Sequence, residues 1–279
     1  MSFSSEVKVE LSKINNLANK DQVYAEFIGY ILTINSTIGT KKIKYSTESE
    51  YNINRYNKLL KNLDIDYDIK IQGKVYYITC KNKLELKEES IDLKSLDNRS
   101  LIRGMFMGSG SINNPNNTYH LEMILKKEVV VDYVCEILKE YDIQVKTLKR
   151  KKGCSIYIKD GEEISKFLAF IGANSSVLKF EEIRVVKETR NNINRIVNCE
   201  TANLNKTINA AVEQINAINK IIEKDRLNDL TEKDKEIAIL RIENPEASLV
   251  ELGRMLDTPI GKSGVNHRLK RIIEFAKSI

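Results

Sequence analysis

The chain has 279 residues, of which 42% are hydrophobic and 30% are charged, a mixture typical of soluble globular proteins. No apolar run approaches the roughly 18 residues that a membrane-spanning helix needs. The start MSFSSEVKVE lacks the apolar core of a signal peptide. We therefore expect a cytoplasmic protein without membrane contact, and the length favours two domains over one small core. The net charge of +6 permits nucleic-acid binding without arguing for it.

The cysteines do not suggest a metal site. They are far apart, none belongs to a CxxC motif, and no histidine lies nearby at ligand spacing. We expect free thiols in a reducing compartment, no metal and no cofactor. The four are Cys80, Cys135, Cys154 and Cys199.

The first two thirds of the chain show one order of elements twice: helix, strand, helix, then a hairpin of two strands. Gly73 and Gly153 mark the tight turns of the two hairpins. Coincidence between two α/β stretches is the alternative to a duplication. The first copy is predicted at 21–36, 42–46, 50–62, 67–71 and 75–78, and the second at 98–111, 119–124, 128–140, 145–148 and 154–158.

Each copy begins with a helix that has small residues among bulky ones, FIGYILTIN at 27–35 and IRGMFMGSG at 102–110. Gly29, Gly104 and Gly108 allow helix backbones to approach closely. We therefore predict that the two helices pack against each other at a pseudo-two-fold axis. One ordinary buried helix in each half is the alternative.

Residues 179–226 are predicted to be helical, because their apolar content is too high for a disordered linker. Three cations there, Arg190, Arg195 and Lys206, are candidates for contact with a DNA backbone. A helix face stabilised by ion pairs is the preferred interpretation.

The last fifty residues are typical of a helix-turn-helix. Thr231 precedes a first helix as its N-cap, and Pro245 ends that helix. Ser248 and Glu251 form a capping box for a second helix. The segment 257–261 then forms a turn, and Ser263 is expected to cap the third helix.

The third helix has one apolar and one polar face at 100° per residue. Donor-rich side chains at the front of a helix that follows a short turn are the geometry of a major-groove recognition helix. We expect Lys262 and Arg268 to hold phosphates. The side chains expected to face base edges are Asn266, His267, Lys270 and Arg271. A three-helix bundle with a solvated basic face is the alternative. The candidate DNA-binding residues are Lys262, Ser263, Asn266, His267, Arg268, Lys270 and Arg271.

These motifs resemble the WhiA family of bacterial regulators, and the paired helices resemble the LAGLIDADG motifs of homing endonucleases. Further matches are GSGSINNP at 108–115, RVVKE at 184–188, NCETAN at 198–203 and KSGVNHRL at 262–269. The resemblance implies an α+β fold with a duplicated αββ-type saddle domain at 1–178, whose repeats span about 20–96 and 97–172. It also implies a helical bridge at 179–226 and an all-α helix-turn-helix at 227–279 that is similar to sigma region 4.

In homing endonucleases of this fold, carboxylates at the ends of the motif helices hold a divalent metal. The corresponding positions here are Ile34 and Ser109, and neither is an anionic ligand. Nearby acids (Glu26, Asp97, Glu122) do not occupy the motif positions. We therefore predict no catalytic residue and no nuclease activity.

The basic strand with Lys42 and Lys44 lies on the sheet that contacts DNA in the nuclease relatives. These lysines are candidates for phosphate contact, and a solvated edge that prevents sheet aggregation is an equally good interpretation.

The resemblance implies a sequence-specific transcriptional regulator of cell division, chromosome segregation and, in sporulating bacteria, sporulation. Double-stranded DNA is the expected partner, with RNA polymerase or its sigma factor as a further one, and the chain is expected at the nucleoid as a monomer. Two alternatives stay open. One is a nucleoid-associated division protein that binds DNA non-specifically, and the other is a nuclease with unconventional acids.

Overall fold

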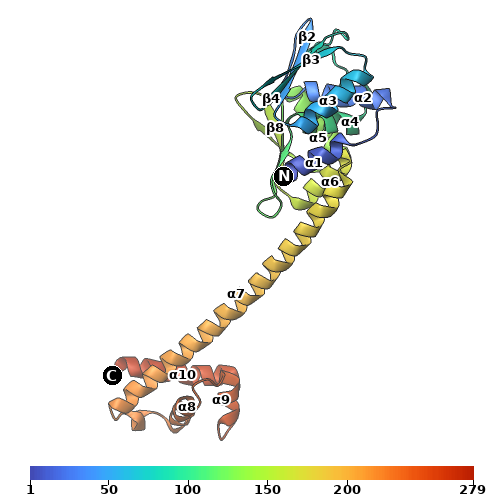
Figure 1. The fold of residues 1–279 in the computed structure, drawn as a ribbon. Coiled ribbons are helices and arrows are strands. Elements are labelled where there is room, and N and C mark those ends of the chain that lie inside the picture. The colour runs from blue at the N-terminus through green and yellow to red at the C-terminus, as the bar shows by residue number, and fades with distance from the viewer. The chain divides into compact units, whose positions relative to one another are not determined.

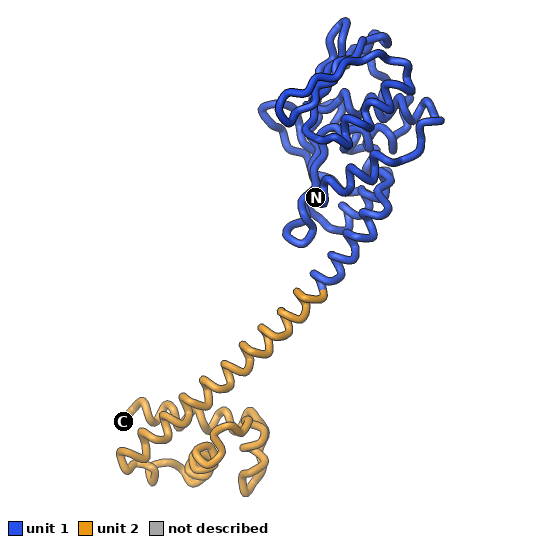
Figure 2. The backbone as a smooth tube through the Cα atoms, viewed as in Figure 1, with its two compact units in different colours: residues 1–188 blue, residues 189–279 orange. Residues whose placement is uncertain are grey.

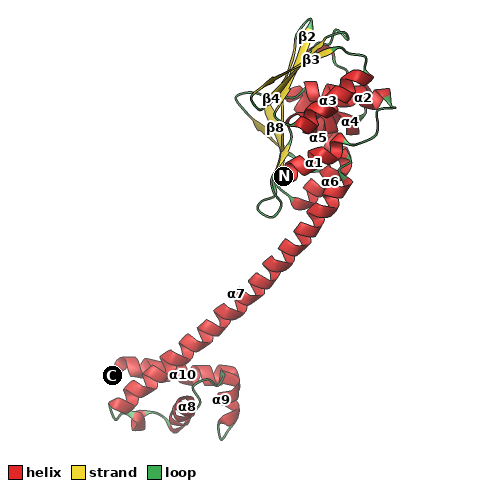
Figure 3. Cartoon of the chain, in the orientation of Figure 1, coloured by secondary structure: helices red, strands yellow, loops and turns green.

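The computed structural model describes residues 1–279, apart from the side chain of residue 88. The chain divides into two compact units, residues 1–188 (unit 1) and residues 189–279 (unit 2) (Figure 2). The boundary falls within helix α7 (Asn174–Glu223). Both sheets belong to unit 1, and unit 2 is helical (Figure 3). In the described part of the chain, no helix combines the length and hydropathy needed to cross a bilayer.

Unit 1 contains the predicted repeat. Each copy has a four-stranded antiparallel sheet, and the strand orders β1-β2-β4-β3 and β5-β6-β8-β7 are equivalent. This confirms the predicted α+β class with two αββ-type halves. The first copy consists of α2 (Lys20–Ile31), β1 (Ser36–Ile38), β2 (Lys42–Thr47), α3 (Glu50–Asn62), β3 (Tyr67–Gln72) and β4 (Val75–Lys81), and the second of α4 (Asn98–Ser109), β5 (Ser111–Ile112), β6 (Leu121–Leu125), α5 (Glu128–Glu140), β7 (Lys146–Lys149) and β8 (Cys154–Ile158).

The short strands β1 and β5 were not predicted. With three and two residues, they are too short to show the alternation by which a strand is recognised in sequence. Each lies at the edge of its sheet and pairs with the next strand, so that Ser36 lies opposite Tyr45 and Ser111 opposite Glu122.

Both hairpin turns contain a glycine with a positive φ, 60° at Gly73 and 85° at Gly153. Residues with a side chain rarely adopt this conformation. The predicted turns between β3 and β4 and between β7 and β8 are confirmed.

Helices α2 and α4 pack with their backbones in contact, as predicted from the small residues. A Cβ atom at Gly104 would lie 2.1 Å from the carbonyl oxygen of Glu26, and one at Gly29 would lie 2.2 Å from that of Leu101. Real Cβ atoms do not approach backbone atoms so closely. The glycines are therefore a requirement of this helix pair.

Unit 1 is completed by α1 (Phe3–Ser12), α6 (Gly161–Ile171) and the start of α7, which line one side of the unit (Figure 1). Two short 3-10 turns, η1 (Glu88–Ser90) and η2 (Leu93–Ser95), lie between the copies. The Glu10 carboxylate accepts hydrogen bonds from the backbone N–H groups of Ser175 (2.7 Å) and Ser176 (2.9 Å). Glu10 of α1 therefore caps the start of α7. The buried face of α1 consists of Phe3, Val7 and Leu11.

One continuous helix, α7, covers residues 179–223 of the segment that we predicted to be helical. No proline or glycine occurs between residues 174 and 223, so no local signal interrupts the helix.

Unit 2 consists of the rest of α7, η3 (Leu227–Asp229), α8 (Glu232–Glu243), α9 (Leu249–Met255) and α10 (Lys262–Ser278). Its core also includes the end of α7, which lies before the boundary expected at residue 227. The buried core residues are Ile218, Ile221, Ile237, Ala238, Leu252, Leu256, Val265, Leu269, Ile272 and Ala276.

Candidate nucleic-acid interface

The two motif positions in unit 1 bind the same backbone carbonyl. The hydroxyl of Ser109 donates to the carbonyl oxygen of Ile124 (2.8 Å), and the backbone N–H of Ile34 donates to the same atom (3.4 Å). The Ser109 Oγ also accepts from the backbone N–H of Ile124 (3.1 Å). The side chain of Ile34 is exposed hydrocarbon. Neither position offers the anionic oxygen that a divalent metal needs.

Glu26 is fully buried at the contact of the motif helices and forms ion pairs with two arginines. Its Oε1 lies 2.7 Å from Nε of Arg55, and its Oε2 lies 3.4 Å from Nη1 of Arg103. Burial lowers the pKa of Arg103, and the Glu26 carboxylate opposes that shift. The carboxylate is thus part of the core and is not available to a metal ion.

The two other acids near the motifs are also engaged. Asp97 caps α4 by accepting from the backbone N–H of Ser100 (2.9 Å), and Glu122 is ion-paired with Arg150. Among the described residues, no three histidines, cysteines or acids are grouped so that they could hold a metal ion.

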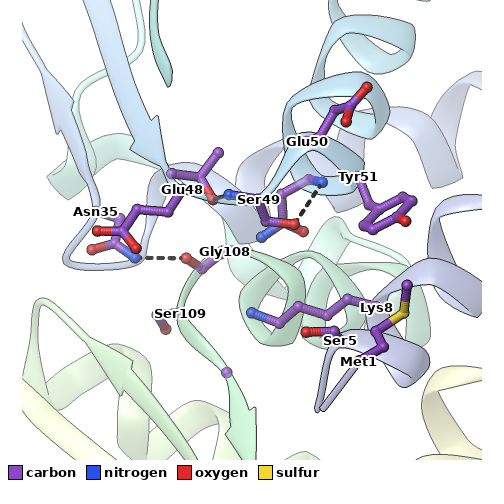
Figure 4. A pocket seen from close by; sticks show the side chains of 13 residues that line it. Met1, Ser5, Lys8, Asn35, Glu48, Ser49, Glu50, Tyr51, Gly108 and Ser109 are labelled. Carbon is purple, nitrogen blue, oxygen red and sulfur yellow. Dashed lines mark hydrogen bonds between the residues drawn. The ribbon is translucent and has the colours of Figure 1, made fainter. Parts of the chain in front are cut away.

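A pocket of about 500 Å³ lies beside the end of α4 (Figure 4). The amino group of Lys8 lies 5.8 Å from the centre of the Phe106 ring, and burial lowers the pKa of this lysine to about 8. The lining also contains two acids, Glu48 and Glu50. The lining residues are Met1, Ser5, Lys8, Asn35, Thr47, Glu48, Ser49, Glu50, Tyr51, Asn52, Gly108, Ser109 and Gly110.

The first sheet presents lysines on its open face. Lys42 and Lys44 are exposed on β2 and alternate with the buried Ile43 and Tyr45. Lys42 lies opposite Lys81 of β4. The two candidate lysines therefore belong to a basic, solvent-exposed surface.

The second sheet has fewer unpaired cations. Arg150 is paired with Glu122, and Nζ of Lys149 lies 3.0 Å from Glu128. The two copies have the same strand order but different charge on the corresponding face.

In unit 2, α8 and α9 support α10 through the caps that the sequence predicted. Thr231 accepts from the backbone N–H of Asp234 (3.3 Å), and Ser248 and Glu251 form the capping box of α9. A Cβ atom at Gly253 would lie 2.2 Å from the carbonyl oxygen of Ile260. The turn before α10 therefore packs directly on α9.

The prediction that Ser263 caps α10 is wrong. The helix begins at Lys262, and its N-cap is Gly261, because Gly261 already has the extended conformation of a cap residue (φ −73°, ψ 165°). No side chain caps this end among the described residues. The backbone N–H groups of the first turn of α10 therefore have no side-chain cap from the described part of the chain, and they lie beside the exposed Lys262 and Ser263.

The seven candidate residues of α10 divide into three groups. Lys262, Ser263 and His267 are exposed at the start of the helix. Ser263 and His267 lie on the polar side of the helix, and the apolar face is buried as predicted: Val265, Leu269, Ile272 and Ala276.

The second group, Arg268 and Arg271, contacts α8. Arg268 donates to the carbonyl oxygen of Lys233 (3.2 Å), and Nη2 of Arg271 lies 2.6 Å from Oδ1 of Asp234. The hydroxyl of Thr231 donates to the other carboxylate oxygen of Asp234 (2.9 Å). Sequence analysis found the cap but missed its link to Arg271, which is 37 residues away.

The third group, Asn266 and Lys270, lies in a groove of about 340 Å³ between α10 and α7. Lys270 is exposed and Asn266 is half-buried. The other residues of the groove are Ala210, Glu213, Gln214, Ile273, Glu274 and Lys277.

On α7 the candidates Arg190, Arg195 and Lys206 are exposed. Within unit 2, Arg195 and Lys206 are separated by eleven positions, about three turns of an α-helix, and they therefore lie on the same side of α7.

Two family models match the chain. The model described as the WhiA LAGLIDADG-like domain matches residues 98–190, and the model described as the WhiA C-terminal HTH domain matches residues 193–276. The first model thus covers the second repeat and the start of α7, and the second covers most of unit 2.

Similar proteins cover the chain from end to end. "Probable cell division protein WhiA" of Clostridium tetani is 40% identical over 100% of this chain and 98% of its own length, and that of Staphylococcus carnosus is 37% identical over 100% and 98%. Among solved structures, full-length DUF199/WhiA from Thermatoga maritima has a TM-score of 0.64 at 28% identity and covers 100% of this chain and 99% of its own. The N-terminal LAGLIDADG domain of DUF199/WhiA has a TM-score of 0.54 at 26% identity, over 61% of this chain and 92% of its own.

Proposed function

The chain belongs to the WhiA family, and we propose on this basis that it is a sequence-specific DNA-binding transcriptional regulator without nuclease activity. The observation that carries the proposal is the start of α10, where exposed donors follow a tight turn supported by two capped helices. This is the arrangement by which a helix-turn-helix inserts a helix into the major groove.

We propose that different residues of α10 contact the phosphates and the bases of the DNA. Lys262, Ser263 and the uncapped N–H groups beside them favour a phosphate, and His267 would face base edges one turn later. Arg271 is held at one end by Asp234 while 48% of its side chain is exposed. A guanidinium that is held in place loses less freedom when it binds a guanine.

Asn266 and Lys270, which line the groove beside α7, would also face base edges. The proposed roles of Arg268, of Arg195 and Lys206 on α7, and of Lys42 and Lys44 on the first sheet are contacts with phosphates.

The absence of cleavage is proposed from the motif positions. A hydrocarbon at Ile34 and a hydroxyl engaged at Ser109 cannot neutralise a divalent ion. The measurement is incubation of plasmid with the protein and Mg²⁺ or Mn²⁺. Efficient cutting that is abolished by Ser109→Ala would refute this part of the proposal.

The relatives are named as probable cell division proteins. We propose that this chain controls genes of cell division and chromosome segregation, and of sporulation where the host sporulates. RNA polymerase or its sigma factor would be the partner at promoters. A chromatin-immunoprecipitation map tests this directly, because a regulator gives peaks at promoters.

Sequence reading is tested by titrating labelled DNA that carries a mapped site, and the same DNA with the site scrambled. Arg271→Ala is expected to reduce the preference for the site, and Lys262→Ala to weaken binding to both DNAs by about the same factor. Lys277→Ala, at the far end of α10, removes the same charge as a control and is expected to change either affinity less.

Equal affinity of the unaltered protein for the two DNAs at several salt concentrations would favour the alternative, a nucleoid-associated division protein that binds DNA non-specifically.

A further inference from the structure

The middle of α7 exposes hydrocarbon along a whole segment. Every residue from 188 to 210 is exposed, and the apolar side chains there remain about half accessible. Val186 is 58% exposed, Ile193 55%, Val197 51% and Leu204 59%. Contiguous exposed apolar surface on a soluble protein marks a binding surface.

These four side chains share one face. At 3.6 residues per turn, Val186, Ile193, Val197 and Leu204 fall within about 40° of arc. Two charged residues border the same face, Arg190 on one side and Glu200 on the other. We call this set of six residues the α7 stripe.

The α7 stripe is symmetric about residue 195. Val186 and Leu204 are nine residues from this centre in opposite directions, Arg190 and Glu200 are five residues from it, and Ile193 and Val197 are two. The side chain of Arg195 itself lies on the opposite side of the helix, half a turn away.

Such symmetry has a structural consequence. In a two-fold symmetric pair, residue i of one copy contacts residue j of the other, and j contacts i. Two antiparallel copies centred on residue 195 would therefore place apolar side chains against apolar ones. Each Arg190 would lie beside Glu200 of the other copy, so that two ion pairs form.

A parallel pair lacks this complementarity. It would place Arg190 beside Arg190 of the second copy and Glu200 beside Glu200, and like charges at a helix interface are unfavourable. Within one chain, neither Arg190 nor Glu200 has an ion-pair or hydrogen-bond partner among the described residues. Their opposite charges are therefore available to a second copy.

From this geometry we propose that α7 is a self-association surface, which pairs antiparallel with α7 of a second copy through the α7 stripe. The pairing replaces the monomer expected from the sequence, and it does not depend on the proposed DNA-binding function. The complementary pattern does not extend beyond residues 186–204, because Ile208 of one copy would face Glu182 of the other. A contact of 19 residues is about 27 Å long, and we expect so small an interface to give a dimer with a Kd of about 1–100 μM.

The test is sedimentation equilibrium of the full chain without DNA, over a concentration range that spans this Kd. Ile193→Glu is expected to raise the Kd at least about tenfold, because it places a charge against Val197 of the other copy. The matched control is Ala202→Glu, the same charge on the opposite side of α7, which is expected to leave the Kd within about twofold. Circular dichroism checks that both variants keep their helix content.

Charge reversal tests the direction of pairing. Arg190→Glu and Glu200→Arg should each weaken self-association, because each places two like charges side by side twice. The double variant should associate like the unaltered chain, and a mixture of the two single variants should form mixed dimers in preference to either homodimer.

The proposal is overturned by a chain that stays monomeric to about 100 μM, or by an Ile193→Glu variant that associates as well as Ala202→Glu. Single charge reversals without effect, together with no preference for mixed dimers, would rule out the antiparallel arrangement.

Discussion

Both units contain arginines that are ion-paired with a buried carboxylate, but the arginines differ in how far they are exposed to solvent. In unit 1 the side chains of Arg55 and Arg103 are 1% and 6% exposed, and both are ion-paired with Glu26. In unit 2 Asp234 is also buried, but the side chain of its partner Arg271 is 48% exposed. The first arrangement buries its charged groups away from any ligand, whereas the second fixes an arginine and still presents it to solvent.

The difference agrees with the roles proposed for the two units. A buried ion pair is expensive to break, because the remaining charge has no water around it. A half-exposed arginine can add a second contact without first being desolvated. We therefore expect substitutions in the centre of unit 1 to change stability and substitutions on α10 to change DNA recognition.

The largest effect is expected from Gly104→Ala in unit 1. The added Cβ would lie 2.1 Å from the carbonyl oxygen of Glu26, so α2 and α4 would have to separate. We expect a loss of more than about 3 kcal/mol in the free energy of unfolding of unit 1, measured by urea denaturation. Gly261→Ala in unit 2 is the control, because nothing lies within 4 Å of its Cβ position. Equal losses would show that the helix contact does not limit stability.

Glu26→Gln should have an effect of similar size. It leaves two buried arginines without a counter-charge, and we expect the unfolding free energy to fall by about 3–5 kcal/mol. Asp66→Asn is the control, since its carboxylate is 67% exposed beside Lys81, where ion pairs contribute about 0–1 kcal/mol. If the two variants unfolded at the same urea concentration, loss of the buried carboxylate would not be more destabilising than loss of the exposed one.

Asp234→Asn tests the ion pair of unit 2, in which the arginine is half exposed. Because Arg271 is half exposed, the expected loss of stability is only about 1–2 kcal/mol. The clearer result should be a smaller ratio of affinities for a mapped DNA site over scrambled DNA, because Arg271 loses its anchor. Glu213→Gln, which weakens the exposed pair with Lys277 (3.6 Å), should leave that ratio unchanged. An unchanged ratio in Asp234→Asn would mean that Arg271 does not read bases.

The smallest effect is expected from Lys8→Met, and it depends on pH. Burial lowers the pKa of Lys8 to about 8, below its ordinary value of 10.5. Below pH 8 the lysine is charged in both the folded and the unfolded chain, and its burial costs stability. Between pH 8 and 10.5 the unfolded chain binds more protons, so the cost disappears as the pH rises.

Lys8→Met should therefore stabilise unit 1 at pH 7, and by less at pH 10. The measurement is urea unfolding of both proteins at the two pH values. Lys13→Met, at an exposed lysine just after α1, should show no such change, and an equal gain at both pH values would exclude the charge of Lys8 as the cause.

Local patterns in the sequence determined most of the secondary structure, the duplication and the apolar face of α10. The hairpin glycines, the caps at Thr231 and Ser248 and the apolar spacing of α10 each act within one turn or one strand, so they can be recognised without knowing the partner. The one cap that was misplaced, at Ser263, depended on whether the chain at Gly261 was already extended, which the packing of the turn on α9 decides.

Only the tertiary structure decided which charges meet. Glu26 lies 29 residues from Arg55 and 77 from Arg103, and Asp234 lies 37 residues from Arg271. Helical spacing tells which face of a helix a side chain occupies, but not what packs against that face. The assignment of a charge to the core, to a groove or to solvent therefore emerges when distant segments are brought together.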